Sequence, residues 1–183
     1  ISGFRTELPM EEFEAILRET NFSVISQSGN ICPADKKIYS LRNATGTVDS
    51  IPLICASIMS KKLATNADCL LLDVKCGSGA FMKTHEEAQK LAVLMEKIGN
   101  MAGKRCKAVV TDMNTPLGKN IGNALEVSEA LEILRGNDKG SLYELCMQLT
   151  AEILVLADKG SYDECLAMAK ESVSSGKALE IFR

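Results

Sequence analysis

Residues 69–81 read CLLLDVKCGSGAF, and this stretch decides the fold that we expect for the chain. Its first part, CLLLDVK, is a nearly continuous apolar run with the length of a buried strand, and a Gly-rich turn follows it. An apolar run without strict alternation is typical of a strand that is covered on both faces, as parallel strands are. The stretch therefore predicts a strand inside an α/β sheet.

A helix and a second strand follow this segment. Residues 84–104 repeat apolar side chains at helical spacing, and Thr84 is a suitable N-cap. Residues 106–113, CKAVVTDM, form another apolar run of strand length. Because the connections are short, the order strand, helix, strand favours a parallel pair with the helix packed on the sheet.

The remainder of the C-terminal half is expected to be helical. Residues 125–136 predict a helix that ends at Gly136, and residues 141–182 predict further helices with breaks at 158–161 and 174–177. Together these elements predict the α/β class, with a partial parallel sheet flanked by helices.

The N-terminal third has a different pattern. Residues 9–21 predict a short amphipathic helix, and residues 22–27 have strand-like composition. Two helices are expected over 33–43 and 50–64, separated by ATGTV. These two bury little obvious sheet-facing surface, so we expect them to belong to a small all-helical lobe.

The implied domain organisation has three parts. Residues 1–29 are expected to start the α/β lobe, residues 30–66 to form part of the helical lobe, and residues 67–183 to complete the α/β lobe. The chain begins with Ile and ends on an apolar helical pattern without a stop signal. We therefore expect a piece of a longer protein, truncated at its C-terminus.

Composition narrows the function classes. The net charge is −3 and no long Lys/Arg run occurs, so nucleic acid is not an expected partner. The apolar runs are too short to span a bilayer, and the N-terminus does not have the pattern of a signal peptide. Seven scattered cysteines with one His predict buried, reduced thiols in a cytoplasmic protein rather than a zinc site or disulfides.

One helix carries an unusual polar pair. The stretch ASIMSKKLA, residues 56–64, is rich in short and apolar residues, yet Ser57 and Lys61 stand four positions apart and share a helix face. Tyr39 and Arg42 precede them and would converge on them if the two helices pack antiparallel. A hydroxyl beside cationic groups suits a flat ligand with several carbonyl acceptors. Unremarkable surface charges are the competing interpretation.

Two loops are weaker candidates. The turn KCGSG matches neither the P-loop nor the dinucleotide-binding pattern, so a tight strand-to-helix connection is favoured over a phosphate site. The loop PLGKNIGN could offer backbone carbonyls, with the carboxylate of Glu129, to a hard cation. His85, the only His, lies in the first turn of a helix beside two glutamates and is expected at the surface.

Several long phrases resemble a known family. SIMSKKLA, DVKCGSGAFMK and PLGKNIGNALEV are similar to segments of the pyrimidine nucleoside phosphorylase and thymidine phosphorylase family, and the resemblance covers essentially the whole chain. It implies a fold of the nucleoside phosphorylase/phosphoribosyltransferase type, in which a small helical lobe is hinged to an α/β lobe. It also implies phosphorolysis of a nucleoside to a free base and pentose 1-phosphate, with phosphate as co-substrate, no organic cofactor, and a homodimeric parent enzyme.

The resemblance also implies site residues. Arg42, Ser57 and Lys61 would bind the pyrimidine, with Tyr39 packed nearby, and Arg42 and Lys61 would stabilise the negative charge of the departing base. Some relatives bind potassium, and the matching positions form a set of two backbone carbonyls and one carboxylate: Leu117, Asn120 and Glu129.

The chain departs from the family in one respect. The family's Gly/Ser-rich phosphate-binding loop with its Lys-His-Ser motif has no match here, so we expect little or no activity from this chain alone. Two alternatives stay open. One is an enzyme related to anthranilate phosphoribosyltransferase, and the other is a non-catalytic domain that binds a base or only serves as a folding unit.

Overall fold

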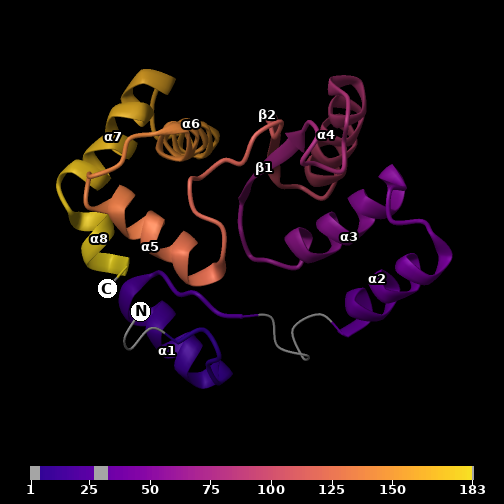
Figure 1. Ribbon diagram of the computed structural model, residues 1–183, viewed down its shortest axis with the longest axis horizontal. Helices are drawn as coiled ribbons and strands as arrows, with labels where there is room; N and C mark the ends of the chain where they lie inside the picture. Colours follow the sequence, from indigo (N-terminus) through magenta and orange to yellow (C-terminus); the bar gives the residue numbers. More distant parts are fainter. Residues whose placement is uncertain (1–4, 27–32, 183) are drawn as a thin grey trace.

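The computed structural model describes residues 5–26 and 33–182, and this part of the chain contains helices around a small sheet (Figure 1). In chain order the elements are α1 (Met10–Thr20), α2 (Pro33–Thr45), α3 (Ile51–Leu63), β1 (Cys69–Cys76), α4 (His85–Met101), β2 (Arg105–Asp112), α5 (Asn123–Leu134), α6 (Ser141–Leu156), α7 (Tyr162–Ser174) and α8 (Lys177–Phe182). The α/β class expected from the sequence is confirmed.

The sheet is the predicted strand–helix–strand unit. Strands β1 and β2 run parallel, in a register that pairs Cys69 with Arg105 and Cys76 with Asp112. Helix α4 connects them, and a capping box fixes its start: the Thr84 side chain accepts from the backbone N–H of Glu87, whose carboxylate accepts from the Thr84 N–H. The segments 69–75, 84–104 and 106–113 thus form β1, α4 and β2, as the sequence predicted.

The main hydrophobic core lies between α3, β1 and α4. Helix α4 contributes one apolar stripe at helical spacing, and β1 contributes alternate residues from one face. The buried members are Ile54, Cys55, Met59, Leu70, Leu72, Val74, Met82, Ala88, Leu91, Ala92, Met95 and Cys106. Gly99 lets α4 approach β2 closely, because a Cβ there would lie 2.5 Å from the Cβ and Sγ atoms of Cys106.

The C-terminal helices form a second layer of packing. Helices α5, α6 and α7 share a smaller core made by Ile133, Tyr143, Met147, Ala169 and Val173. Helix α6 packs on the strands, and an ion pair of 2.5 Å joins Lys107 of β2 to Glu152 of α6. In Figure 1, α5 to α8 lie on the opposite side of the sheet from α3 and α4.

Helices α2 and α3 form an antiparallel pair. The first turn of α2 contacts the last two turns of α3 through Asp35, and the end of α2 contacts the start of α3 through Arg42 and Leu53. Helix α3 places Ile54, Cys55 and Met59 in the core of the sheet unit. The division into lobes at 1–29, 30–66 and 67–183 stays a prediction, and residues 27–32 lie outside the described part.

The strand expected over 22–27 is wrong for residues 22–26, which form no strand; residue 27 is not described. Within the described part of the chain, the segment pairs with no strand, and its contacts include residues near the two ends of the chain. The Phe22 ring lies 5.8 Å from the ring of Phe182, and Ser26 donates its N–H to the Thr6 carbonyl at 2.7 Å. Strand-like composition alone therefore does not make a strand where no partner strand is present.

The structure also bears on the expectations about membrane spans and about the cysteines. Within residues 5–26 and 33–182, no helix is both long and apolar enough to cross a membrane. Six cysteines of this part are free thiols, and three of them, Cys55, Cys106 and Cys165, are buried. Burial raises the pKa of the Cys55 and Cys106 thiols, which keeps both in the neutral form.

Candidate functional site

The polar pair on α3 forms as the helix spacing requires. Lys61 Nζ donates to Ser57 Oγ at 3.2 Å, one helical turn away. Ser57 is half-buried and the Lys61 side chain is 38% exposed, so the pair reaches the surface. The helix itself therefore presents a hydroxyl and an ammonium side by side.

A carboxylate from α2 joins this pair. Asp35 Oδ1 accepts from Ser57 Oγ at 2.8 Å, and Asp35 Oδ2 accepts from Lys61 Nζ at 2.6 Å. The hydrogen bond from Lys61, and then that from Ser57, lowers the pKa of the Asp35 carboxyl below its usual value. Ser57, Lys61 and Asp35 thus form a closed triangle of contacts, which we call the 35–57–61 cluster.

Arg42 and Tyr39 lie in the same helical pair and form a second group. Arg42 is 4% exposed, and its guanidinium donates to the backbone carbonyls of Val48 and Leu53. Its carbon Cζ lies 5.1 Å from the centre of the Tyr39 ring, within the range of a cation–π contact. Its positive charge also lowers the pKa of Asp35, which links this group electrostatically to the 35–57–61 cluster.

Arg42 has one further property. Its Nε–H is buried and has no hydrogen-bond partner among the described residues. A buried donor without a partner is costly, and such groups are rare in folded proteins. Arg42 is therefore held by two carbonyls, while its buried Nε–H has no partner among the described residues.

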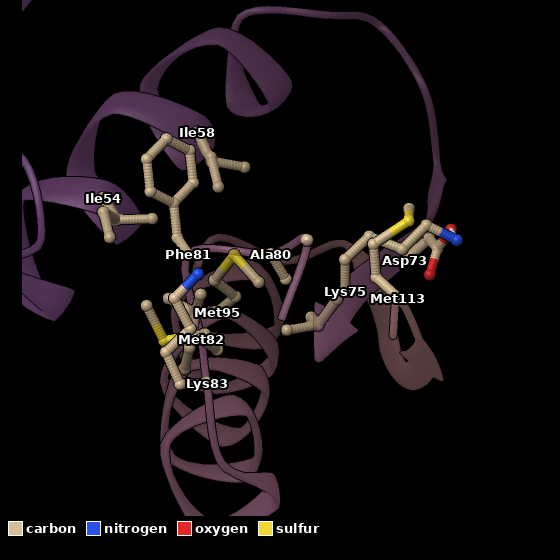
Figure 2. A pocket seen from close by; sticks show the side chains of 13 residues that line it. Ile54, Ile58, Asp73, Lys75, Ala80, Phe81, Met82, Lys83, Met95 and Met113 are labelled. Atoms are coloured by element: carbon tan, nitrogen blue, oxygen red, sulfur yellow. Dashed lines mark ion pairs between the residues drawn. The ribbon is translucent and has the colours of Figure 1, made fainter. Parts of the chain in front are cut away.

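An open cavity of about 510 Å³ lies beside α3 (Figure 2). Ile54 and Ile58 come from the same region of the helix as Ser57 and Lys61, and Figure 2 shows the Phe81 ring beside these two isoleucines. Its other lining residues come from β1, from the turn after β1, from α4 and from the residue after β2: Asp73, Val74, Lys75, Gly79, Ala80, Met82, Lys83, Leu91, Met95 and Met113.

The cavity is largely apolar, with three charged side chains in its lining, Asp73, Lys75 and Lys83. Asp73 and Lys75 form an ion pair of 2.6 Å, and Thr111 of β2 bonds to both of them. On the turn, Lys83 Nζ donates to the Ser78 carbonyl at 3.0 Å. An apolar slot with a few polar groups at its margin is the usual form of a small-molecule site.

The turn after β1 is a tight connection. Gly77, Ser78 and Gly79 donate their backbone N–H groups to the Met82 carbonyl, the Asn114 side chain and the Met113 carbonyl, at 2.9 to 3.1 Å. Gly77 has φ +136°, and a Cβ there would lie 2.8 Å from the Asn114 backbone N. These amides are already bonded within the protein, so the turn does not present them to a phosphate.

The loop before α5 closes on Glu129. This side chain is buried, and its carboxylate accepts the backbone N–H groups of Lys119 at 2.8 Å and Asn120 at 3.0 Å. The Leu117 carbonyl accepts from Ser141 Oγ at 2.8 Å. Within the described residues, Glu129 has no cationic side chain in ion-pair contact.

This loop is the one for which the sequence predicts a hard cation. Buried charges are normally paired or coordinate a metal, and the Glu129 carboxylate is held here by two backbone amides and interacts electrostatically with Lys119. In the described part of the chain, no group of three His, Cys, Asp or Glu side chains is arranged to hold a metal ion. A potassium ion held by Glu129 and by backbone carbonyls stays a prediction for this loop.

Comparison with known proteins decides the family. The family model described as "Glycosyl transferase family, a/b domain" matches residues 1–179. The chain belongs to this family. Two similar curated relatives of the glycosyl transferase family are both called pyrimidine-nucleoside phosphorylase: one from Bacillus subtilis strain 168, 52% identical, and one from Staphylococcus aureus strain USA300, 50% identical.

These glycosyl transferase relatives are longer than the present chain. Each alignment extends over 184 positions and covers 100% of this chain but 42% of the relative. The resemblance noticed in SIMSKKLA and DVKCGSGAFMK is confirmed at the level of the family. The individual roles of Tyr39, Arg42, Ser57 and Lys61 are not tested by this similarity.

Sequence reasoning missed Asp35 in this member of the glycosyl transferase family. Asp35 lies in the first turn of α2, where an acidic residue is already explained by its favourable interaction with the helix dipole. It stands 22 positions before Ser57 and 26 before Lys61, so no spacing rule connects it to either residue. Antiparallel packing of the two helices, which the sequence analysis considered only as a condition, is the only signal that could have found it.

Proposed function

We propose that this chain carries the base-binding part of a pyrimidine nucleoside phosphorylase. The observation that carries this proposal is the 35–57–61 cluster on α3, the helix that the resemblance assigns to the base. The same helix contributes Ile54 and Ile58 to the apolar cavity, although no member of the cluster lines it. The names of the relatives support the same reaction class. The substrates are then a pyrimidine nucleoside and phosphate, and the products are the free base and pentose 1-phosphate.

The cavity and the cluster supply complementary halves of a base site. A pyrimidine has two apolar faces and a polar edge with carbonyl oxygens. Ile54, Ile58 and Phe81 offer apolar surface to the faces, while Ser57 and Lys61 offer hydrogen bonds to the edge. Arg42 and Tyr39 support the site from α2.

The reaction needs stabilisation of the leaving base. A phosphate oxygen forms a bond to C1′ of the pentose while the bond from C1′ to the base nitrogen breaks, and its electron pair stays on the base. The base departs as an anion and then takes up a proton. Lys61 donates to a carbonyl oxygen of the base as the negative charge develops, and Arg42 contributes its charge from behind the site, so both residues are the proposed catalytic groups.

Phosphate is expected to bind outside this chain. The amides of the KCGSG turn are bonded within the protein, and the sequence contains no match to the family's phosphate loop. We expect the chain alone to bind the base weakly and to have little or no turnover. The division into a helical lobe over 30–66 and an α/β lobe belongs to the same proposal.

Other parts of the proposal concern the ion, the assembly and the compartment. Potassium, held by Glu129 with the carbonyls of Leu117 and Asn120, would neutralise the buried carboxylate and fix the loop before α5, and no organic cofactor is needed. The full-length protein is proposed to be a homodimer in the cytoplasm, where the free thiols of Cys55 and Cys165 stay reduced.

The test is phosphate-dependent release of uracil or thymine from uridine and thymidine. It is run on this chain and on a full-length protein that contains it, with a phosphate-free control. Release by the full-length protein alone is the expected result. Release of neither base by the full-length protein, together with tight binding of anthranilate, would replace the proposal with the phosphoribosyltransferase alternative. Uracil binding without turnover in either protein would indicate a non-catalytic domain.

A further inference from the structure

The 35–57–61 cluster fixes the direction of each of its hydrogen bonds. An ionised carboxylate only accepts, and a Lys ammonium only donates. Ser57 must therefore give its single hydroxyl proton to Asp35 Oδ1, at 2.8 Å, while it accepts from Lys61 Nζ at 3.2 Å. The lowered pKa of Asp35 keeps this carboxylate ionised at neutral pH, so the assignment has no alternative there.

The bonds that remain free define what the cluster can recognise. A hydroxyl oxygen has two lone pairs, and Ser57 uses one of them for Lys61. Lys61 has three N–H donors, of which Asp35 and Ser57 take two. Towards a ligand, Ser57 is then only an acceptor and Lys61 only a donor.

This acceptor–donor pair distinguishes between pyrimidine bases. Uracil and thymine present an N–H donor at N3 beside the carbonyl acceptor at C4, which is the complementary order. Cytosine presents a bare N3 acceptor beside an amino donor at C4, which is the opposite order. With cytosine, the N3 lone pair would face the Ser57 lone pair, and the C4 amino donor would face the Lys61 donor, so neither hydrogen bond could form.

We infer that Asp35 is a specificity-determining residue that acts through Ser57: by holding the Ser57 proton, it selects imide bases such as uracil and thymine against cytosine. The inference rests on the proposed function, because it assigns a role at the same base site. Asp35 itself contacts no base. It is a positioning residue: because it takes the proton of the Ser57 hydroxyl, Ser57 can only accept a hydrogen bond from the base.

The deciding variant is Asp35→Asn. The Asn oxygen would accept from Lys61, and its amide nitrogen would donate to Ser57, so the Ser57 proton would become free to donate to a ligand. The full-length protein is assayed with phosphate and either uridine or cytidine, and kcat/KM is measured for both. We expect the wild-type ratio of uridine to cytidine to fall by about tenfold in Asp35→Asn, the value of one reversed hydrogen bond.

A matched control separates this effect from a loss of helix stability. Asp163 is also an acidic first-turn residue, on α7, and it is exposed and far from the cluster in sequence and fold. Asp163→Asn should leave the ratio unchanged. Thermal unfolding of both variants shows whether each is folded, and uracil and cytosine binding followed by calorimetry gives the ratio even where turnover is slow.

A double-mutant cycle tests whether Asp35 acts through Ser57. In a Ser57→Ala background, Asp35→Asn should change the uridine-to-cytidine ratio by less than about twofold, since the proton that it controls is gone. A wild-type protein that turns over uridine, with an unchanged ratio in Asp35→Asn, overturns the inference and leaves the proposed function intact. A folded wild-type protein that neither binds nor turns over any pyrimidine overturns both.

Discussion

Helices α2 and α4 are both amphipathic elements that flank α3, yet they are fixed by different forces. Helix α4 buries Leu91, Met95 and neighbouring small residues in the main core, whereas the only buried residue of α2 is Arg42. Helix α2 is attached to α3 by polar side chains, namely Asp35 on Ser57 and Lys61, and Arg42 on backbone carbonyls.

This difference separates stability from recognition. Apolar burial is non-directional and gives most of the folding free energy, while hydrogen bonds and ion pairs add little net stability and fix geometry. The α2–α3 contact is therefore suited to hold reactive groups in place, and the β1–α4–β2 unit is suited to hold the chain together. Substitutions in the two regions should affect different measurements.

The largest expected effect is on turnover. Lys61→Ala in the full-length protein should lower kcat by about 100-fold or more, the usual loss when one donor to a developing negative charge is removed. Its free energy of unfolding should change by about 1 kcal/mol or less, because the ion pair with Asp35 is partly exposed. Steady-state kinetics and urea unfolding measure the two quantities.

Lys62→Ala is the matched control, since Lys62 is the next residue of α3 and is exposed. It should keep normal turnover and normal stability. Normal turnover in Lys61→Ala would show that the base-binding assignment is wrong.

The second effect belongs to the other region. Met95 of α4 is 2% exposed, and Met95→Ala should lower the free energy of unfolding of this chain by about 2 to 4 kcal/mol through the cavity it creates. Met101 lies on the same helix and is 78% exposed, so Met101→Ala should change the free energy of unfolding by about 0.5 kcal/mol or less. Equal losses in the two variants would contradict the placement of the core.

A third effect concerns the loop closed on Glu129. If potassium binds there, the free energy of unfolding in a potassium salt at ten times the Kd should exceed that in the same concentration of a tetramethylammonium salt by about 1.4 kcal/mol. For a chain of this size that corresponds to a fall in Tm of about 3 to 6 °C. Glu129→Gln removes the charge and should abolish the difference between the salts. The same Tm in both salts for the wild type would exclude this ion site.

The smallest effect is the pH dependence of the α2–α3 contact. The pKa of Asp35 is lowered in the folded state by Lys61 and Ser57, so the carboxylate stabilises the fold above its unfolded pKa of about 3.9. This stabilisation is lost as the pH falls through the lower, folded pKa. The stability difference between wild type and Asp35→Asn, measured by urea unfolding, should therefore be present at pH 7 and shrink below about pH 4. A difference that stays constant with pH would show that ionisation of Asp35 does not contribute.

Local patterns in the sequence were sufficient for most of the fold. The apolar runs at 69–75 and 106–113 and the spacing of 84–104 correspond to β1, β2 and α4, because burial on both faces and the period of a helix leave direct traces in the sequence. The break at Gly136 follows from its φ of +79°, which Gly adopts without strain. Residues 22–26 show the limit, since β composition without a partner edge does not make a strand.

The candidate site was only half predictable. The sequence by itself determined that Ser57 and Lys61 share a face of α3, because positions four apart on a helix are neighbours whatever surrounds them. Only the tertiary structure decided that Asp35 closes the cluster and that Arg42 turns to the carbonyls of Val48 and Leu53, because these contacts depend on how two separate helices pack. Helical periodicity is a local property of the chain, whereas a hydrogen bond between helices exists only once their relative position is fixed.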